Sequence, residues 1–349
     1  MSAGPAHHPR TLLVTGGAGF IGLNFVGYLL EKYREVRVVT LDLLTYAGSR
    51  ADLEAIADPA RHVFVHGDIA DAMLVREVLS RHRIDTIINF AAESHVDRSI
   101  DAPAAFVRTN VVGTFTLLEA ARDAWLEGEG SGSTRFHQVS TDEVYGSLED
   151  DEPPFTEQTP YAPNSPYAAS KAAADHLVRA YHRTYGLPVT ITNCSNNYGP
   201  YQHAEKFIPT VIRSCLEGQS IPIYGAGRNV RDWLHVSDHC TAVDLTVRSG
   251  RPGETYLVGA NNEWRNIDLA RQICRLLDEL RPLSGKRHEE LIASVTDRRG
   301  HDFRYALDGS KICSELGWEP TIGFDDGLRS TVEWYLARWL DQPPRQPMY

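Results

Sequence analysis

A glycine-rich turn near the start of the chain constrains the fold more than any other feature of the sequence. A short apolar segment, Thr11–Thr15, runs into GGAGFIG at residues 16–22, and an amphipathic helical pattern continues to about residue 33. Gly17, Gly19 and Gly22 fit G-x-G-x-x-G, and Gly16, Gly19 and Gly22 fit G-x-x-G-x-x-G. Such glycines let a strand turn sharply into a helix and bring the backbone close to a pyrophosphate, which the free N–H groups of the helix N-terminus can bind.

The next apolar segment ends in a carboxylate at the position that a dinucleotide-binding fold requires. Val36–Leu41 is followed by Asp42, about twenty residues after the glycine turn. A carboxylate there accepts a hydrogen bond from the adenosine ribose and repels a 2′-phosphate, so the sequence predicts NAD in preference to NADP. Asp68 ends a third segment, where it can meet the adenine amino group or cap a helix, and the sequence leaves both interpretations open.

Strand-like and helical segments alternate through the first part of the chain. The strand-like segments at 62–65, 85–90, 136–139 and 189–193 are separated by helical patterns, of which Pro103–Trp125 is the longest. This alternation predicts an α/β fold with a Rossmann-like, doubly wound parallel sheet.

The pattern loosens after residue 200, which indicates a second structural unit. We expect a disordered leader at 1–10, an NAD-binding Rossmann domain at 11–200, and a smaller, partly interleaved substrate-binding domain at 201–349. Apolar segments near 235–260 are expected to rejoin the Rossmann core. The Gly- and Ser-rich run at 128–133 predicts a flexible surface loop.

Two adjacent carboxyl groups follow the predicted strand at 136–139. Thr141-Asp142-Glu143 lies where that strand ends, at the edge of an open α/β sheet where ligands bind. Neighbouring side chains of a strand point to opposite faces, so both acids reach one substrate only from an irregular loop. If both do, their surroundings should keep one protonated as an acid and the other ionised as a base.

Tyr167 and Lys171 are spaced by one helical turn and therefore share one face of a helix. A free Tyr has a pKa near 10, which is too high for a base at neutral pH. The positive charges of Lys171 and of a nicotinamide ring favour the phenolate and lower that pKa. Tyr167 can then accept a proton from a sugar hydroxyl while a hydride leaves the same carbon.

Composition excludes several other classes of protein. A net charge of −11 over 349 residues argues against nucleic-acid binding. The N-terminus has no apolar core of a secretory signal, and no apolar run approaches the roughly 18 residues of a membrane span. The five cysteines form no CxxC pair and show no metal-ligand spacing, which indicates reduced thiols, a cytoplasmic protein and no metal site.

Several separated motifs together resemble a known family. The glycine turn and Tyr167-x-x-x-Lys171 resemble the extended short-chain dehydrogenase/reductase superfamily. Within it the chain is similar to the dTDP-glucose 4,6-dehydratases, over about residues 11 to 335. The motifs that carry this likeness are AAESHVDRS at 91–99, STDEVYG at 140–146, NCSNNYGP at 193–200, RDW at 231–233 and DRRGH at 297–301.

The resemblance implies a reaction and a role for each catalytic residue. The family oxidises C4 of a nucleotide-linked glucose with bound NAD, removes water across C5 and C6, and returns the hydride to C6. By this likeness Tyr167 is the base at the 4-hydroxyl, which Thr141 hydrogen-bonds, and Lys171 tunes Tyr167 and holds the nicotinamide ribose. Glu143 removes the C5 proton, and Asp142 protonates the leaving C6 hydroxyl.

The resemblance also implies the ligand contacts and a homodimer built on the helix after residue 102 and the helix bearing Tyr167. Cofactor contacts fall on Gly16, Gly19, Phe20, Ile21, Gly22, Asp42, Leu43, Leu44, Thr45, Asp68, Ile69, Phe90, Ala91, Ala92, Thr109, Tyr167, Lys171 and Asn197. Substrate contacts fall on Ser94, Thr141, Asn196, Lys206, Phe207, Pro222, Ile223, Tyr224, Arg231, Asn266, Asp297, Arg298 and His301. Lys206, Arg231 and Arg298 suit a negatively charged diphosphate, whereas Asn266 fits a loop-capping amide equally well.

Three positions depart from the family pattern, and we expect them to tune affinity without changing the reaction. Leu43 stands where the family often has Lys, Phe207 replaces a common Leu, and Arg299 stands where Pro is usual.

Two other functions remain as alternatives. The first is another nucleotide-sugar enzyme of the same superfamily: a different 4,6-dehydratase, a 4-epimerase or a decarboxylase. All of these would keep Tyr167 and Lys171, but an epimerase or decarboxylase does not need the Asp142–Glu143 pair. A catalytically silent NAD-binding regulatory protein would need none of these residues intact.

Overall fold

A parallel sheet of seven strands forms the centre of the computed structural model, which describes residues 6–127 and 133–340. The strand order is β10-β6-β5-β4-β1-β2-β3, and each neighbouring pair is parallel. This topology confirms the predicted doubly wound α/β class. The strands are β1 (Thr11–Thr15), β2 (Arg37–Asp42), β3 (His62–His66), β4 (Thr86–Asn89), β5 (Arg135–Thr141), β6 (Val189–Cys194) and β10 (Thr255–Val258).

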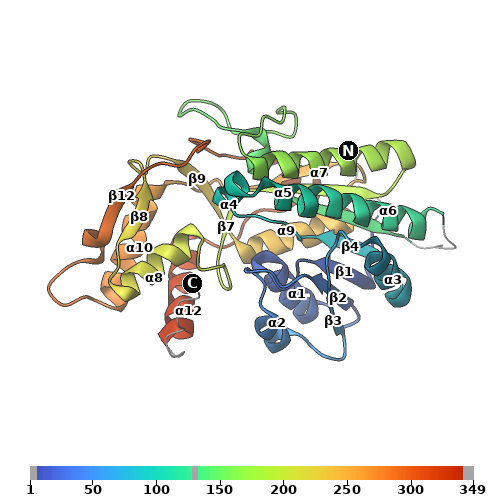
Figure 1. Ribbon diagram of the computed structural model, residues 1–349, viewed down its shortest axis with the longest axis horizontal. Helices are drawn as coiled ribbons and strands as arrows, with labels where there is room; N and C mark the ends of the chain where they lie inside the picture. The colour runs from blue at the N-terminus through green and yellow to red at the C-terminus, as the bar shows by residue number, and fades with distance from the viewer. Residues whose placement is uncertain (1–5, 128–132, 341–349) are drawn as a thin grey trace.

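Helices cover both faces of the sheet because its strands are apolar on both sides (Figure 1). One face packs against α1 (Phe20–Lys32) and α9 (Val236–Ser249). The other packs against α3 (Ala72–His82), α6 (Thr114–Trp125) and α7 (Pro166–Tyr185). The short helices α2 (Arg50–Ile56) and α4 (Val96–Asp101), which the sequence did not predict, lie in the connections after β2 and β4.

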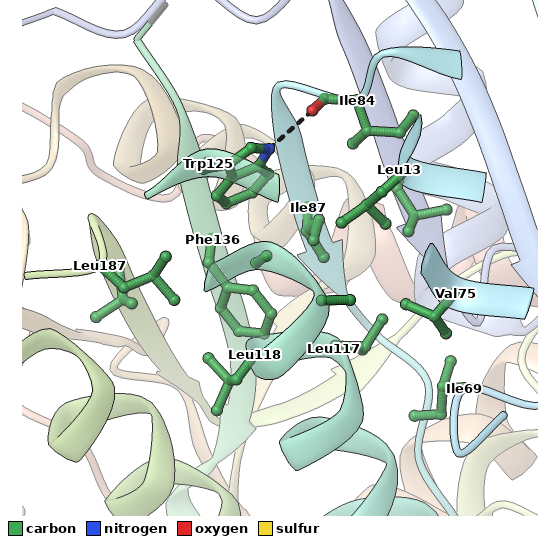
Figure 2. Packing of buried hydrophobic residues seen from close by; sticks show 14 of the residues in the cluster. Leu13, Ile69, Val75, Ile84, Ile87, Leu117, Leu118, Trp125, Phe136 and Leu187 are labelled. Atoms are coloured by element: carbon green, nitrogen blue, oxygen red, sulfur yellow. Dashed lines mark hydrogen bonds between the residues drawn. The ribbon is translucent and has the colours of Figure 1, made fainter. Parts of the chain in front are cut away.

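The second of these faces contains the largest cluster of buried apolar side chains. Figure 2 shows Leu117 and Leu118 of α6 among Phe136 of β5 and their apolar neighbours. Trp125 closes one end of this cluster, where its indole Nε1 donates to the Ile84 carbonyl oxygen at 2.9 Å. That hydrogen bond satisfies the ring N–H in an otherwise apolar setting and fixes the end of α6 against the start of β4.

The C-terminal part of the chain builds a second core beside the end of the sheet (Figure 1). Two small sheets contribute to it, one with the order β11-β9-β7 and one pairing β12 with β8. Three long helices surround them, and the chain also returns from this region to the main sheet through α9 and β10. The elements are β7 (Asn196–Tyr198), α8 (Phe207–Glu217), β8 (Ile221–Tyr224), β9 (Val230–His235), β11 (Glu263–Arg265), α10 (Asn266–Leu280), the 3₁₀ turn η3 (His288–Leu291), β12 (Ile292–Val295) and α12 (Phe324–Leu340). The short helix α11 (Ser310–Leu316) packs against α9 and β10 instead.

The start of the chain differs from the expected disordered leader. Residues 1–5 lie outside the described part, but His7 is fully buried, and its Nε2 lies 2.7 Å from the Thr86 hydroxyl. Its backbone N–H donates to the Arg248 carbonyl at 2.7 Å. Residues 6–10 therefore pack onto the sheet, and the expectation of disorder there was wrong. Five residues of the expected loop at 128–133 also lie outside the described residues.

The expected helix over Pro103–Trp125 is present, but it contains a π-helical stretch. It consists of α5 (Pro103–Phe106), a π-helix η1 (Val107–Gly113) and α6. A π turn widens the helix locally, and such turns are frequent beside functional sites. No helix within residues 6–127 and 133–340 is both long enough and apolar enough to span a bilayer.

We predict that Gly22→Ala destabilises the protein more than Gly27→Ala. Both residues lie in α1, but an added Cβ at Gly22 overlaps the Gly16 carbonyl oxygen and lies 2.8 Å from the Gly17 Cα. At Gly27 the nearest atom is the end of the Ile56 side chain, at 3.2 Å. We expect a loss of roughly 1–3 kcal/mol at Gly22 and a change below about 1 kcal/mol at Gly27. Urea denaturation of both variants checks this, and equal losses would contradict it.

Candidate active site

A deep cavity lies at the carboxyl ends of the strands in the main sheet, the edge where open α/β sheets bind ligands. It brings together nearly all the predicted cofactor residues, from Gly16 to Asn197 along the chain, and of that set Leu44 alone does not line it. Leu44 has a left-handed backbone with φ +53° and packs against the apolar core. The predicted substrate and catalytic residues that also line the cavity are Ser94, Thr141, Asp142, Glu143, Asn196 and Lys206.

The glycine turn supplies the floor of one half of the cavity. Gly16, Gly19 and Gly22 line it, whereas Gly17 packs against Thr40, whose side chain an added Cβ would meet at 2.7 Å. The pattern G-x-x-G-x-x-G is therefore the one that faces the cavity. Gly16 has φ +67°, and an added Cβ there would lie 2.7 Å from the Ala91 backbone nitrogen, so only glycine fits this turn.

Helix α1 begins at this turn with no side chain capping its N-terminus, because the N-cap residue is Gly19. The first N–H groups of a helix have no partner within the helix. Phe20, Ile21 and Gly22 carry these groups and line the cavity. Free N–H donors beside glycine backbone form a site that fits a diphosphate.

Asp42 ends β2 beside the glycine turn and is nearly buried. Its carboxylate accepts from the backbone N–H groups of Ala18 at 2.9 Å and Leu44 at 2.8 Å. Burial raises the pKa of Asp42, and these two hydrogen bonds oppose the increase. Each carboxylate oxygen can accept a second bond, so Asp42 can still receive a ribose hydroxyl from the cavity.

Asp68 lines the cavity and does not cap a helix. The N-cap of α3 is Asp71, whose side chain accepts from the first turn of that helix. Asp68 instead accepts from the Ala70 backbone N–H at 2.8 Å and from the Arg108 guanidinium at 2.9 Å. The capping interpretation was therefore wrong, while an adenine contact remains a prediction.

The two adjacent acids enter the cavity because the chain leaves the strand at Thr141. Residues Asp142–Tyr145 form a 3₁₀ turn, η2. Thr141 caps this turn, since its hydroxyl accepts from the Glu143 backbone N–H at 3.3 Å and lies 3.2 Å from Asp142 Oδ1. A strand would have sent the two acids to opposite faces, whereas the turn directs both toward one cavity.

The surroundings of the two acids differ. Asp142 is buried, and its Oδ2 has no hydrogen-bond partner in the described part of the chain. Burial and the neighbouring Glu143 raise the pKa of Asp142 well above its usual value. Burial also raises the pKa of Glu143, but the cationic groups of Arg298, Arg231 and Lys206 oppose that increase. Asp142 therefore favours the protonated form, and Glu143 has the cations that an ionised carboxylate needs.

Tyr167 and Lys171 approach the same cavity from α7. Both are buried, and the Lys171 ammonium donates to the Val139 carbonyl oxygen at 2.8 Å. Burial is the largest cause of a raised pKa at Tyr167 and of a lowered pKa at Lys171. At Tyr167 the neighbouring Thr141 hydroxyl opposes the effect of burial. The pKa of Tyr167 is therefore raised in this structure, opposite to the lowering that the sequence predicted from Lys171.

Hydrogen bonds from the π-helical stretch η1 connect two segments that line the cavity. Thr109 lines the cavity, and the next residue, Asn110, is buried. The Asn110 amide donates to the Glu93 carbonyl at 3.0 Å and to the Ser170 hydroxyl at 2.8 Å. It thus connects the loop after β4 to the helix that carries Tyr167 and Lys171.

Four predicted substrate residues form a separate group around Asp97. The Arg298 guanidinium lies 3.5 Å from one Asp97 oxygen, and the Tyr224 hydroxyl donates to the other at 3.1 Å. His301 lies 2.6 Å from Asp297 and packs edge-on against Tyr224. These residues lie outside the cavity lining, on elements of the C-terminal region.

The remaining predicted substrate residues do not line the cavity. Arg231 is buried, and its guanidinium donates to the carbonyls of Val230, Asp302 and Phe303 at 2.6–3.2 Å. Asn266 begins α10, whose N-cap is Arg265, so its amide does not cap that helix. The others are Phe207 at the start of α8, and Pro222 and Ile223 within β8.

A set of polar residues in two loops around the cavity was not predicted from the sequence. Gln202 and His203 line it, and Glu205 joins the loops because it lies 2.7 Å from Arg98 and 3.6 Å from His95. Arg98 also stacks 3.8 Å from the centre of the Tyr46 ring. These contacts join segments far apart in sequence, and no local spacing indicates them.

Several buried polar atoms around the cavity have no partner within residues 6–127 and 133–340. Buried polar groups in folded proteins are nearly always hydrogen-bonded, so partnerless atoms on several residues that line one cavity favour a polar ligand there. Together with the glycine turn and Asp42, they fit a dinucleotide beside a hydroxylated substrate. The atoms are Asp142 Oδ2, Asn196 Oδ1 and Gln202 Oε1.

Comparisons with known proteins agree with this geometry. The family model described as GDP-mannose 4,6 dehydratase matches residues 13–331. A dTDP-glucose 4,6-dehydratase of Xanthomonas campestris is 59% identical over 330 residues, which cover 94% of this chain and 93% of that protein. The dTDP-glucose 4,6-dehydratase of Streptomyces venezuelae, solved with NAD bound, superposes with a TM-score of 0.85 at 51% identity, covering 94% and 97% of the two chains.

A more distant solved structure shares the same fold. The UDP-glucose 4-epimerase of Thermotoga maritima gives a TM-score of 0.82 at 27% identity, covering 94% of this chain and 99% of that one. The fold alone therefore does not separate a dehydratase from an epimerase, whereas the sequence identity does. The chain belongs to the GDP-mannose 4,6 dehydratase family and, within it, to the dTDP-glucose 4,6-dehydratases.

Proposed function

We propose that this protein is a hydro-lyase that converts dTDP-glucose to dTDP-4-keto-6-deoxyglucose, a step of deoxysugar biosynthesis. The observation that carries the proposal is the convergence of Asp142, Glu143 and Tyr167 on one cavity. Gly16, Gly19, Gly22 and Asp42 would hold NAD, which would supply a hydride acceptor for C4 of the glucose and a hydride donor for C6. The chain's own residues must then move four protons. One leaves the 4-hydroxyl, one leaves C5, one is donated to the departing C6 hydroxyl, and one returns from Glu143 to C5 when the hydride is added at C6.

The first proton leaves the 4-hydroxyl, and Tyr167 is the proposed base. Thr141 lies beside it as a hydrogen-bonding group for the same sugar oxygen. Burial disfavours the phenolate, so a cation near Tyr167 is required, and Lys171 on the same helix face supplies it. Loss of this proton together with the hydride leaves a ketone at C4.

The second and third protons move during elimination. The C4 ketone acidifies the proton at C5, which Glu143 accepts, and the electron pair of that C–H bond forms the C5–C6 double bond. The C6 hydroxyl leaves as water after Asp142 donates a proton to it. The raised pKa of Asp142 supports its role as the acid, and the cations around Glu143 support its role as the base.

The charged groups of the C-terminal region suit the nucleotide diphosphate of the substrate. Lys206 lines the cavity, and Arg298 lies in the neighbouring group around Asp97. We therefore infer that residues 11–200 bind mainly NAD and that residues 201–349 bind mainly the substrate, with 235–260 belonging to the first unit. We also infer a cytoplasmic location, which the free thiols of all five cysteines support.

A homodimer is the proposed assembly. Val107, Val112 and Phe115 are each 44–52% exposed on one continuous helical run. Exposed apolar side chains of this size beside α7 support a helical interface between two copies.

The proposed function predicts a specific product. Incubation with dTDP-glucose should give dTDP-4-keto-6-deoxyglucose without net formation of NADH, because the hydride returns to the same sugar. Mass spectrometry and absorbance at 340 nm measure both quantities. Unchanged sugar, or dTDP-galactose from a 4-epimerase, would contradict the proposed function, and UDP-, CDP- and GDP-glucose test the preference for the base.

The second prediction separates the two acids. Glu143→Gln should lower turnover by roughly 10²–10⁴-fold while NADH still forms in a single turnover, because Tyr167 remains intact. Exchange of the C5 hydrogen with solvent deuterium should stop in this variant. In the matched variant Asp142→Asn, C5 exchange should continue while water loss slows, since the base remains and the acid is absent. Normal turnover of Glu143→Gln would remove Glu143 from the role of base.

The third prediction concerns assembly. Phe115→Glu places a charge in the proposed interface and should produce monomers, whereas Met73→Glu alters an exposed side chain on α3 and should leave the mass unchanged. Light scattering after size exclusion measures the mass, and a monomeric wild-type protein would reject the dimer.

A further inference from the structure

Asp175 is a fully buried carboxyl group that the proposed proton transfers do not use. It lies on α7 one helical turn after Lys171, and therefore on the same face of that helix. Arg179 follows after another turn. The carboxylate therefore lies between two cationic residues along one face of the helix, and both interact with it electrostatically.

The hydrogen bonds of Asp175 indicate its charge. Its Oδ2 accepts from the Ser140 hydroxyl at 2.7 Å, the Tyr161 hydroxyl at 2.9 Å and the Asn193 amide at 3.3 Å. Its Oδ1 is buried without a partner in the described part of the chain. Three donors on one oxygen suit an ionised carboxylate.

The cations on either side are held by other groups. The Lys171 ammonium donates to the Val139 carbonyl, and the Arg179 guanidinium donates to the Tyr161 hydroxyl at 2.8 Å and the Thr255 hydroxyl at 3.2 Å. Burial lowers the pKa of Lys171, and Asp175 is the first group that opposes this. Burial likewise raises the pKa of Asp175, and Lys171 is the first group that opposes it. Each buried charge therefore stabilises the other.

The same carboxylate also fixes the strand end that carries the acids. Ser140 directly precedes Thr141, and the Asn193 amide that reaches Asp175 also donates to the Thr141 carbonyl at 3.0 Å. Asp175 thus connects α7 to β5 and β6 at the residues where both enter the cavity.

We propose that Asp175 is a positioning residue, a buried counter-charge that keeps the Lys171 ammonium charged beside Tyr167 and fixes the helix that carries both to the ends of β5 and β6. The inference deepens the proposed function, because it concerns the group that supports the base of the first step.

Neutralising Asp175 should change the titration of Lys171 in one direction. An opposite charge favours the ammonium, so its removal lowers the pKa of Lys171, and the ammonium is lost at a lower pH. The titratable groups that face this pair from other elements are Tyr145, Tyr161 and Cys194, while Asp142 and Glu143 of η2 face the neighbouring Tyr167. All of them remain in the Asp175→Asn variant, which is nearly isosteric.

The test uses the small number of lysines in the chain, which are Lys32, Lys171, Lys206, Lys286 and Lys311. In protein labelled with ¹³C at the lysine ε-carbons, Lys171→Arg assigns the Lys171 signal. We expect its titration midpoint to fall by about one pH unit or more in Asp175→Asn. Ser140→Ala removes a hydrogen bond to the same carboxylate but keeps its charge, so its midpoint should stay near the wild-type value.

The Asp175→Glu variant separates the effect of the negative charge at this position from the effect of side-chain packing. It keeps the charge in a tightly packed site, so a counter-charge role predicts a midpoint near that of wild type even if the melting temperature falls. Should Asp175→Asn fail to fold, Asp175→Ala is a second neutral variant for the same titration. An unchanged Lys171 midpoint in a folded neutral variant, or equal shifts in Asp175→Asn and Ser140→Ala, would overturn the proposal.

A kinetic measurement keeps this inference separate from the proposed function. The rate of NADH formation in a single turnover can be measured against pH in a Glu143→Gln background. Adding Asp175→Asn should make this rate fall at a lower alkaline pH, because Lys171 loses its proton at a lower pH. If the Glu143→Gln background forms no NADH with dTDP-glucose, the proposed reaction fails while the NMR titration still decides the role of Asp175.

Discussion

The burial of charged and titratable groups at one edge of the sheet is the constraint on which the rest of the structure depends. Asp142, Tyr167, Lys171 and Asp175 are each at most 8% exposed. Removing such groups from water is unfavourable unless hydrogen bonds and opposite charges replace the solvent. The carbonyl of Val139, the Ser140 hydroxyl and the amide of Asn193 supply these partners. Strands β5 and β6 therefore contribute their polar groups to the site as well as their apolar side chains to the core.

The fold and most of the proposed cofactor site could be predicted from sequence because their signals are local. The glycines, the strand that ends at Asp42 and the alternation of elements depend on spacing within about thirty residues. Other features depend on contacts that no local pattern contains. Asn110, in the π-helical stretch, bonds Glu93 and Ser170, and His7 packs beside Thr86.

The substrate side was harder to predict for the same reason. Arg231 is a suitable residue type for a diphosphate, but the structure directs its N–H groups to backbone carbonyls. Glu205 was missed because its partners, Arg98 and His95, lie about a hundred residues earlier in the chain. Residue type therefore indicates which chemistry is possible, while the packing of distant loops decides which donors remain free for a ligand.

The different proposed roles of Asp142 and Glu143 depend on both the main sheet and the C-terminal region. The two acids are adjacent, so the sheet alone gives them nearly the same position. Asp142 turns inward, where burial favours its protonated form. Glu143 faces cations contributed by Lys206, Arg231 and Arg298, all from the C-terminal region. Without that region both acids would lie beside each other with like charge and no compensating cation. Packing of the second unit against the sheet thus converts a pair of neighbouring carboxyls into the proposed acid and base.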